Sequence, residues 1–426
     1  MRVHKRRVLT QEQAERDDKA GANATLALLF VVYLFNYLDR TLIYILFQPI
    51  KAELALSELQ LALLGSTSFV LFYTTLGVPF GRLADRVSRT RMIAAGLAIW
   101  SLASALTGAM HDFGGIFACR VLVGVGEATL GPAALSLLAD LFSPRRRATV
   151  SAAFSAGIPI GAGTALLLGG VFGARFGWRN AFYLCGAPGV LLAGVVLLLR
   201  EPQRGRTEGA VAAVAEPLSQ TLLGLSRVRG LGTVIFGYAL FAIASNALSM
   251  WVPSFLVRVY GVPLAKAGLY TGLTAASCGL VGVLGGGFCA DLFETRQRGG
   301  RLNFSALCAL GCAALWALLL RSHDVSGVLV CFGGLTALGL SWLGPAAADV
   351  QALAGPARRG IAIGVYFFFV NLIGYGIVPP LIGRLSDSLH VSVDPSQMRL
   401  SLMVCPAAAC LAALVLFRAA ALRRRG

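Results

Sequence analysis

The chain has 426 residues, of which 57% are hydrophobic and 13% are charged, and its mean hydropathy is +0.74. Soluble domains carry about 25% charged residues, so this composition excludes an ordinary soluble protein. The formal net charge of +17 does not indicate a nucleic-acid partner, because the basic residues lie in short segments between apolar stretches and not on one soluble surface.

Apolar stretches of about 20 residues, long enough to cross a bilayer, recur along the whole chain. They predict twelve transmembrane helices, at 24–50, 59–81, 91–111, 114–141, 148–174, 179–199, 231–257, 266–290, 303–321, 325–353, 360–385 and 400–421. We therefore expect an all-α integral membrane protein with an N-terminal tail at 1–23, six-helix bundles at 24–199 and 231–421, a linker at 200–230 and a C-terminal tail at 422–426.

The dense basic clusters fall in the two tails, the linker and the loops that follow even-numbered helices. The positive-inside rule places such segments in the cytoplasm. Both termini are therefore expected there. Few lysines beside many arginines, alanines and glycines favour a GC-rich bacterial source, and hence an inner (plasma) membrane.

The two halves of the chain resemble each other. Residues 131–170 align without a gap with residues 344–383, a shift of half the chain length, and the Gly-Pro-Ala-Ala at 131–134 recurs at 344–347. The repeat predicts two pseudo-symmetric bundles in parallel orientation, with a substrate site at their interface near the bilayer midplane. The alternative is a shared membrane composition without a common origin.

Four charged residues lie well away from the ends of predicted helices: Asp39 and Arg40 in the first, and Arg120 and Glu127 in the fourth. A charge near the bilayer centre is expensive, so such residues mark a pathway, a proton relay or a counter-ion. A rise of 1.5 Å per residue puts both acids near mid-depth. Arg120 and Glu127 are two helical turns apart and share one face.

Gly124 and Gly126 lie beside that face of the fourth helix. Small residues allow another helix to approach closely, and we expect that neighbour to be the first helix. Nine cysteines are scattered through the apolar helices without metal-ligand spacing, so neither a zinc site nor a disulfide framework is expected.

Several motifs resemble known transporter signatures. The segment Gly81–Arg91 (GRLADRVSRTR) resembles the loop 2–3 signature of the major facilitator superfamily, with Ser88 in place of the usual glycine, and Arg120-x-x-x-Gly-x-Gly-Glu127 resembles its helix 4 signature. The segments 36–40 (NYLDR), 157–159 (GIP) and 200–202 (REP) are most similar to spinster-like transporters. This resemblance implies the major facilitator fold and transport of lysophospholipids or sphingoid phosphates.

We expect Asp39 and Glu127 to carry protons and Arg120 to act as their switching partner, since an arginine keeps its charge and can only change partners. Arg40 and Arg120 would bind an anionic head group, and the spinster resemblance implies the same roles. The alternative is a permanent ion-pair cluster that locks the first and fourth helices together. If Asp39 and Glu127 do carry protons, water that reaches them from alternate sides would couple proton movement to transport.

The second half lacks such charges, since Val252, Gly333 and Leu340 stand 213 positions after Asp39, Arg120 and Glu127. One charged wall facing an apolar and aromatic wall suits an amphiphile. The residues predicted to bind the substrate are Arg40, Arg120, Asn36, Tyr37, Asn246, Trp342, Tyr366 and Asn371.

The loop 2–3 signature also predicts a gate at the cytoplasmic side. Asp85 would cap a helix of the other half, Arg86 or Arg89 would pair with Asp140, and Asp349 would make a similar contact. Such contacts would close that side and break when it opens.

Other classes of protein fit less well. The chain has no G-x-x-x-x-G-K-[ST] loop and no H-E-x-x-H motif, so neither a primary pump nor a membrane protease is indicated. We expect a monomeric transporter, not an enzyme, with protons as coupling ion, no metal or cofactor, and membrane lipids and an amphiphile as partners. The rival hypothesis is a proton-coupled transporter of a small organic anion.

Overall fold

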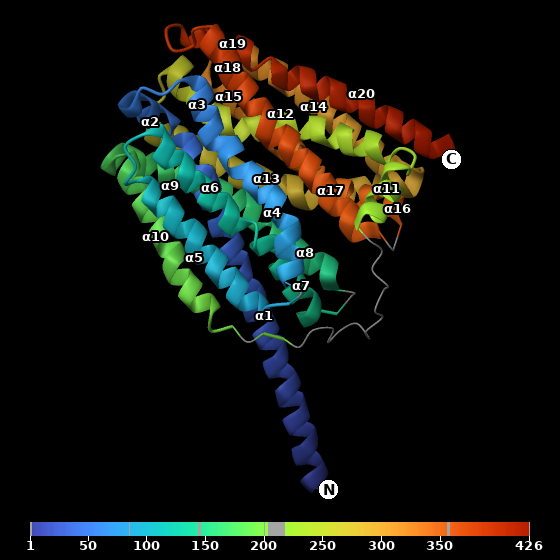
Figure 1. Cartoon of the computed structure of the whole chain (residues 1–426). Coiled ribbons are helices and arrows are strands. Elements are labelled where there is room, and N and C mark those ends of the chain that lie inside the picture. The colour runs from blue at the N-terminus through green and yellow to red at the C-terminus, as the bar shows by residue number, and fades with distance from the viewer. Residues whose placement is uncertain are drawn as a thin grey trace.

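The structure is a computed structural model that describes residues 2–84, 86–143, 146–199, 201–202, 218–355 and 358–425. Within these residues it contains helices and no strand. Twelve helical segments are long and apolar enough to cross a membrane, which confirms the all-α fold class with twelve membrane spans. Figure 1 shows the first half of the chain, in blue and green, beside the second half, in yellow to red.

The first half forms six spans and a short connecting helix. Its elements are α1 (Arg2–Ile45), α2 (Phe47–Leu54), α3 (Glu58–Ala62), the π-helix η1 (Leu63–Thr67), α4 (Ser68–Ala84), α5 (Arg89–Thr107), α6 (Phe113–Glu127), α7 (Leu130–Leu141), α8 (Arg147–Ser155), α9 (Gly157–Phe176) and α10 (Trp178–Val196).

The second half repeats this arrangement after the helix α11 (Leu218–Ser226). Its elements are α12 (Leu231–Tyr260), α13 (Leu264–Arg296), α14 (Gly300–Arg321), α15 (Val325–Leu340), α16 (Leu343–Ala354), α17 (Arg359–Asn371), the π-helix η4 (Leu372–Ile377), α18 (Val378–Ser388), the 3-10 helix η5 (Pro395–Gln397), α19 (Met398–Ser401) and α20 (Val404–Arg425).

The internal repeat is visible in how the helices break. The fourth span stops after Glu127 and resumes at Leu130, and the tenth stops after Leu340 and resumes at Leu343. These positions coincide when the numbering is shifted by half of the 426 residues. The two halves therefore share local backbone geometry as well as sequence.

Each predicted span overlaps an observed one, with differences at the ends. The first span ends at Ile45 and not at residue 50, because the chain turns at Leu46 into α2. The eighth span extends to Arg296 rather than 290. The expected tail at 1–23 belongs to α1, which begins at Arg2, and part of the expected linker forms α11.

The serine at position 88, where the loop 2–3 signature has glycine, has a structural role. It is the N-cap of α5, and its hydroxyl accepts a hydrogen bond from the backbone N–H of Arg91 at 3.3 Å. Serine is among the best N-caps, so the residue that replaces glycine here starts the following helix.

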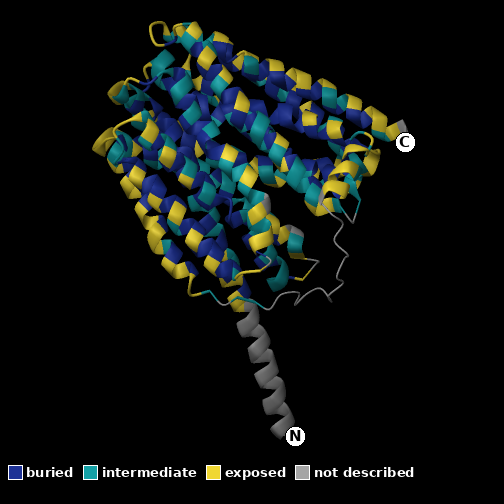
Figure 2. Cartoon of the chain, in the orientation of Figure 1, coloured by how far each residue is buried: buried dark blue, intermediate teal, exposed yellow. Residues whose placement is uncertain are grey.

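The lateral surface of the bundle is apolar. Figure 2 shows exposed residues spread along the outer faces of the helices, and they include Leu198 (81% exposed), Phe288 (75%) and Val330 (75%). So many large apolar side chains on one surface mark a contact with lipid. The chain is an integral membrane protein.

The bundle has two ends, which carry different elements. The linker end carries the last turn of α10 together with α11 and α16, and the opposite end carries α2, α3 and α19 (Figure 1). The two halves touch along α9 and α13, where a Cβ atom added at Gly163 would lie 2.4 Å from the carbonyl oxygen of Gly272. Only glycine permits so close a backbone approach.

Polar contacts between the halves gather toward the opposite end. The Asp387 carboxylate of α18 accepts hydrogen bonds from the backbone N–H groups of Glu58 (2.8 Å) and Leu59 (2.9 Å) in the first turn of α3. The buried Glu58 carboxylate in turn pairs with Arg258 of α12 at 2.7 Å. These contacts hold the two halves together at the opposite end.

Three further contacts join the halves: Gln48 to Ser254, Lys51 to Ser392, and the Thr67 hydroxyl of η1 to the Gly376 carbonyl of η4. Among pairs of described residues, no hydrogen bond or ion pair joins the halves at the linker end. The structure is therefore the state that is closed at the opposite end.

Candidate functional site

The charged cluster of the first half is centred on an ion pair between Arg40 and Glu127. The Arg40 guanidinium of α1 donates to Glu127 Oε2 of α6 from Nε (3.0 Å) and Nη2 (2.6 Å). Both side chains are almost completely buried. A guanidinium that gives two donors to a carboxylate forms one of the strong hydrogen-bonded pairs.

Aromatic rings surround the same guanidinium. The Arg40 Cζ lies 4.7 Å from the ring centroid of Tyr37, 4.3 Å from that of Phe69 and 4.8 Å from that of Tyr73. Arginine over aromatic faces gains cation–π energy, and more so when water is excluded. Tyr37 and Tyr73 are partly exposed, so this cage reaches the surface of the first half.

Asp39 faces another way and lacks a cation. Its Oδ2 accepts a hydrogen bond from the Ser101 hydroxyl of α5 at 3.1 Å. Its Oδ1 is buried without a hydrogen-bond partner, as is the nearby hydroxyl of Ser104. No ion pair links Asp39 to a described residue. A buried carboxyl group in this setting is costly in its charged form.

Arg120 makes no hydrogen bond with the carboxylate of Asp39 or Glu127 in this structure, and its role as their switching partner stays a prediction. Its guanidinium donates to three backbone carbonyls, of Leu64 (3.3 Å), Asp39 (3.1 Å) and Arg40 (3.1 Å). Leu64 lies in the π-helix η1, and π-turns disturb the regular backbone pairing of a helix. Arg120 thus fastens α6 to α1 and η1.

The expectation that Gly124 and Gly126 admit the first helix is wrong. A Cβ at Gly124 would lie 2.4 Å from the Phe69 carbonyl of α4, and one at Gly126 would lie 2.7 Å from the Gly96 carbonyl of α5. The glycines therefore bring α4 and α5 close. The face of α6 that meets α1 carries the Arg40–Glu127 pair, whose bulk keeps these helices further apart.

The predicted substrate residues differ in position. Asn36 is buried on α1, and Asn246 of α12 and Asn371 of α17 are partly exposed. Trp342 and Tyr366 are instead buried in the packing of the second half, with ring centroids 5.9 and 6.4 Å from that of Tyr238. In this structure they lie within the second half and not on a surface between the halves.

The predicted gate residue Arg89 is the centre of a buried network. Its guanidinium donates to the Asp140 carboxylate, to the Ser136 hydroxyl at 3.0 Å, and to the Pro202 carbonyl at 3.1 Å. It also pairs with Glu201 at 3.1 Å. All these partners belong to the first half or its C-terminal edge, so the network stabilises the linker end of that half without crossing to the other.

Glu201 is a residue that the sequence interpretation missed. Its carboxylate accepts hydrogen bonds from Ser88, from Arg89 and, at 3.0 Å, from Thr90. Burial raises the pKa of this carboxyl, but the hydrogen bonds outweigh burial and lower the pKa to about 2. Its signal in the sequence is the Arg-Glu-Pro segment at 200–202, which resembles the spinster-like family but does not by itself indicate the contacts of Glu201.

Asp349 forms a corresponding cluster in the second half. It is fully buried, accepts from the Tyr238 hydroxyl at 2.9 Å and pairs with Arg423 of α20 at 2.7 Å. Arg423 also approaches Glu294 of α13 at 3.7 Å. This cluster, too, lies within one half. Neither it nor the Arg89 network ties the halves together in this state.

The remaining gate residues add little. Arg86 is exposed, and no hydrogen bond or ion pair links its side chain to a described residue. Asp85 lies outside the described residues. The contacts that do cross between the halves involve Glu58, Arg258 and Asp387, which the sequence interpretation did not single out.

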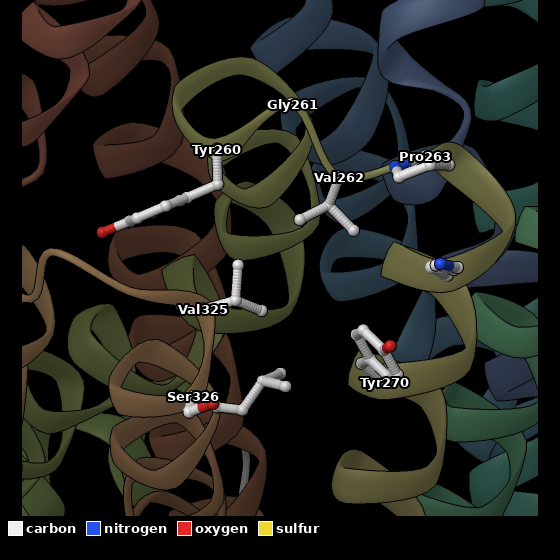
Figure 3. A pocket seen from close by; sticks show the side chains of 9 residues that line it. Tyr260, Gly261, Val262, Pro263, Tyr270, Val325 and Ser326 are labelled. Atoms are coloured by element: carbon white, nitrogen blue, oxygen red, sulfur yellow. The ribbon is translucent and has the colours of Figure 1, made fainter.

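A cavity of about 420 Å³ lies at the opposite end, in the second half only. It is bounded by Tyr260, Tyr270 and the start of α15 (Figure 3). Lys266 is the one cation among its lining residues. It contains no residue of the charged cluster or of the predicted substrate set, so we place the site at the Arg40–Glu127 pair.

Comparisons with known proteins agree with this fold. The model of the Major Facilitator Superfamily matches residues 29–379. An MFS-type efflux pump of Mycolicibacterium smegmatis is 31% identical, over 97% of this chain and 96% of that protein. Protein spinster of Drosophila melanogaster is 29% identical over 88% of this chain, which spans 64% of the fly protein.

A solved structure shows the same fold at lower identity. A bacterial homologue of the human lysosomal transporter Spinster, in an inward-facing and unoccupied conformation, superposes with a TM-score of 0.80 and 24% identity. The alignment covers 95% of this chain and 97% of that one.

Twelve spans in two similar halves, with a buried charged cluster in one of them, define a secondary transporter and not an enzyme. The chain belongs to the Major Facilitator Superfamily. Within it the chain belongs to the spinster-like transporters, since Protein spinster homolog 1 of Xenopus tropicalis is 30% identical over 89% of this chain and 76% of that protein.

Proposed function

We propose that the chain couples protons to the alternating-access transport of an amphiphilic anionic or zwitterionic lipid, such as a lysophospholipid. The observation that carries the proposal is the unequal pairing of two buried acids. Glu127 is bound by Arg40, whereas Asp39 has one hydrogen bond and no cation among the described residues. Two acids in such different surroundings can take different roles.

Asp39 is the proton site in this proposal. A proton keeps its buried carboxyl group neutral while no cation is available, because an unpaired buried charge is unstable. The hydroxyls of Ser101 and Ser104 stand next to it and can accept or donate a hydrogen bond in either protonation state. When the site opens to water on the other side, Asp39 releases its proton.

Arg40 is the head-group site. A phosphate or carboxylate offers its guanidinium the same two-donor geometry that Glu127 now occupies. An incoming anion therefore replaces Glu127 as the partner of Arg40. Glu127, left buried without a counter-charge, then takes up a proton. This exchange links head-group binding to proton uptake.

The second half supplies the apolar wall. Within α12, α17 and η4, the charged residues are Arg258 and Arg359, both at helix ends. Asn246 and Asn371 are the polar side chains predicted to face the substrate. A hydrocarbon tail against this apolar wall would leave few polar groups without a hydrogen bond. A sugar would instead need hydrogen-bond partners from both halves.

We also propose that the linker end faces the cytoplasm of a bacterial inner membrane. Exposed arginines, including Arg82, Arg86 and Arg91, gather at that end, as the positive-inside rule requires. In that orientation the end that is held shut by Glu58, Arg258 and Asp387 faces away from the cytoplasm.

Reconstitution into liposomes tests the proposal. We expect labelled lysophospholipid to move under an imposed pH gradient and short carboxylates not to. Arg40→Ala should weaken binding of the lysolipid more than Arg89→Ala, because Arg89 is engaged within the first half. Transport of short organic anions with no lysolipid movement would favour the rival substrate class.

A further inference from the structure

An apolar groove of about 540 Å³ lies on the outside of the first half, between α4, α5 and the junction of α6 and α7. Its walls include Phe80, Leu83, Met92, Ile99 and Val125. Leu83 and Ile99 are 40% and 44% exposed on helices that span the membrane. The groove therefore opens toward lipid and is separate from the Arg40–Glu127 site.

The floor of the groove is fixed by close helix packing. A Cβ added at Gly96 would lie 2.0 Å from Thr129 Oγ1, and one added at Gly126 would lie 2.7 Å from the Gly96 carbonyl. The walls extend along α5 from Arg91 to Ile99, roughly 12 Å of helix. The helices cannot move closer together here, so the hollow between them has to be filled from outside.

Three exposed arginines lie at or beside one end of the groove. Arg91 and Ser88 line it at the linker end, and Arg82 and Arg86 are exposed beside it. None of these three guanidiniums makes a hydrogen bond or an ion pair with a described residue. Arg89, on the same turn, is by contrast buried and fully engaged.

Apolar walls with arginines at one end match the chemistry of an anionic lipid. We propose that the groove binds an acyl chain of a resident anionic phospholipid, whose phosphate is held by Arg91. The apolar walls face the hydrocarbon, and the exposed guanidiniums lie at the depth of the head groups of that leaflet. A guanidinium binds a phosphate through two donors. A zwitterionic head group also carries a cation, which the three arginines would repel, so we expect it to bind more weakly than an anionic head group.

The position of the groove gives the lipid an effect on the protein. Gly126 and Thr129 of its floor flank the helix break directly after Glu127. A chain seated there supports α6 and α7 from the outer side, while Arg40 holds Glu127 from the other. The lipid therefore stabilises the charged cluster without touching it. This inference does not depend on the substrate or on proton coupling.

Native mass spectrometry of the full chain tests the site, with phosphatidylglycerol and phosphatidylcholine as ligands. We expect one tightly held phosphatidylglycerol and no comparable phosphatidylcholine. Arg91→Ala should weaken binding at least about tenfold, the loss expected when hydrogen bonds from a guanidinium to a phosphate are removed. Ile99→Trp places a larger side chain in the apolar part of the groove and should abolish the binding of phosphatidylglycerol.

Arg82→Ala is the matched control, since Arg82 is exposed at the same end but does not line the groove. Equal loss in Arg82→Ala and Arg91→Ala would overturn the proposal in favour of diffuse attraction to a basic surface. Unchanged binding in both Arg91→Ala and Ile99→Trp would overturn it as well. Movement of phosphatidylglycerol between liposome leaflets by the chain would make the groove an entry route, not a resident site.

Discussion

Asp39 and Arg40 are adjacent in α1, yet their side chains contact different helices. Arg40 binds Glu127 of α6, and Asp39 accepts from Ser101 of α5. Successive residues of a helix are rotated by about 100°, so neighbours in sequence face different partners. One acid of the site thus has a cation and the other has none, and variants of the two should behave differently.

Asp39→Asn should leave the folded state intact and remove pH sensitivity. The substitution keeps the hydrogen bond to Ser101 and breaks no ion pair, so the free energy of unfolding should change by about 1 kcal/mol or less. Liposome uptake measured between pH 5 and 8 should no longer follow the proton gradient. Uptake with the pH dependence of the wild type would exclude Asp39 as the proton site.

Arg40→Ala should be strongly destabilising, because it leaves Glu127 buried without a partner. Breaking a buried pair on one side costs about 3–5 kcal/mol. The double variant Arg40→Ala/Glu127→Leu should recover much of that loss in thermal unfolding. Arg301→Ala, which breaks a more exposed pair with Asp291, is the control and should cost about 1 kcal/mol or less. Equal losses in the two single variants would contradict the buried pair.

Asp387→Asn combined with Glu58→Gln should open the opposite end. Together the substitutions weaken the cap on α3 and the pair with Arg258. Pulsed EPR between labels at Ala52 and Ser388, with the accessible cysteines replaced, should then show a longer second distance. Asp394→Asn should keep the single distance, because among the described residues the Asp394 side chain bonds only to its neighbours Ser396 and Gln397. No change in the double variant would mean that other contacts hold this end.

Glu201→Gln should lower stability equally at pH 5 and pH 8. The pKa of Glu201 is lowered to about 2 in the folded state, against about 4.3 for a free glutamate. Its contribution is therefore complete above the unfolded pKa and is lost only as the pH falls toward 2. We expect a loss of about 2 kcal/mol, typical of hydrogen bonds to a charged group. A loss that varies between pH 5 and 8 would contradict this assignment.

Two glycines of α13 should respond to alanine in opposite directions. A Cβ at Gly272 would lie 2.5 Å from the Gly163 carbonyl, whereas Gly287 has open space around it. Gly272→Ala should cost about 1–3 kcal/mol by overpacking. Gly287→Ala should gain about 0.5–1 kcal/mol from helix propensity. Thermal unfolding in detergent measures both, and destabilisation of equal size would argue against the close contact.

The sequence was sufficient for the spans and for the charged cluster as a group, because hydropathy and buried charge are properties of single segments. The sequence was not sufficient to predict which side chains of the cluster bind each other. Arg120 was expected to be the switching partner of the two acids; in this structure it binds backbone carbonyls, and Arg40 pairs with Glu127. The relative rotation of two helices depends on every side chain between them, and no local pattern records it.

Contacts between the halves were missed for a related reason. Glu58, Arg258 and Asp387 are far apart in the chain, and each stands near the end of a helix, where a charged residue is ordinary. The π-helices η1 and η4, which meet through Thr67 and Gly376, also had no sequence signal. The internal repeat, in contrast, predicted equivalent helices that break at equivalent residues.

The fastening of the two halves at one end has a practical consequence. Because α3 and α18 are joined there by Glu58 and Asp387, the rim they form exists as one continuous surface only while that end is shut. An antibody fragment raised against this rim would trap a single conformer, and its affinity would report how often the molecule visits the other one.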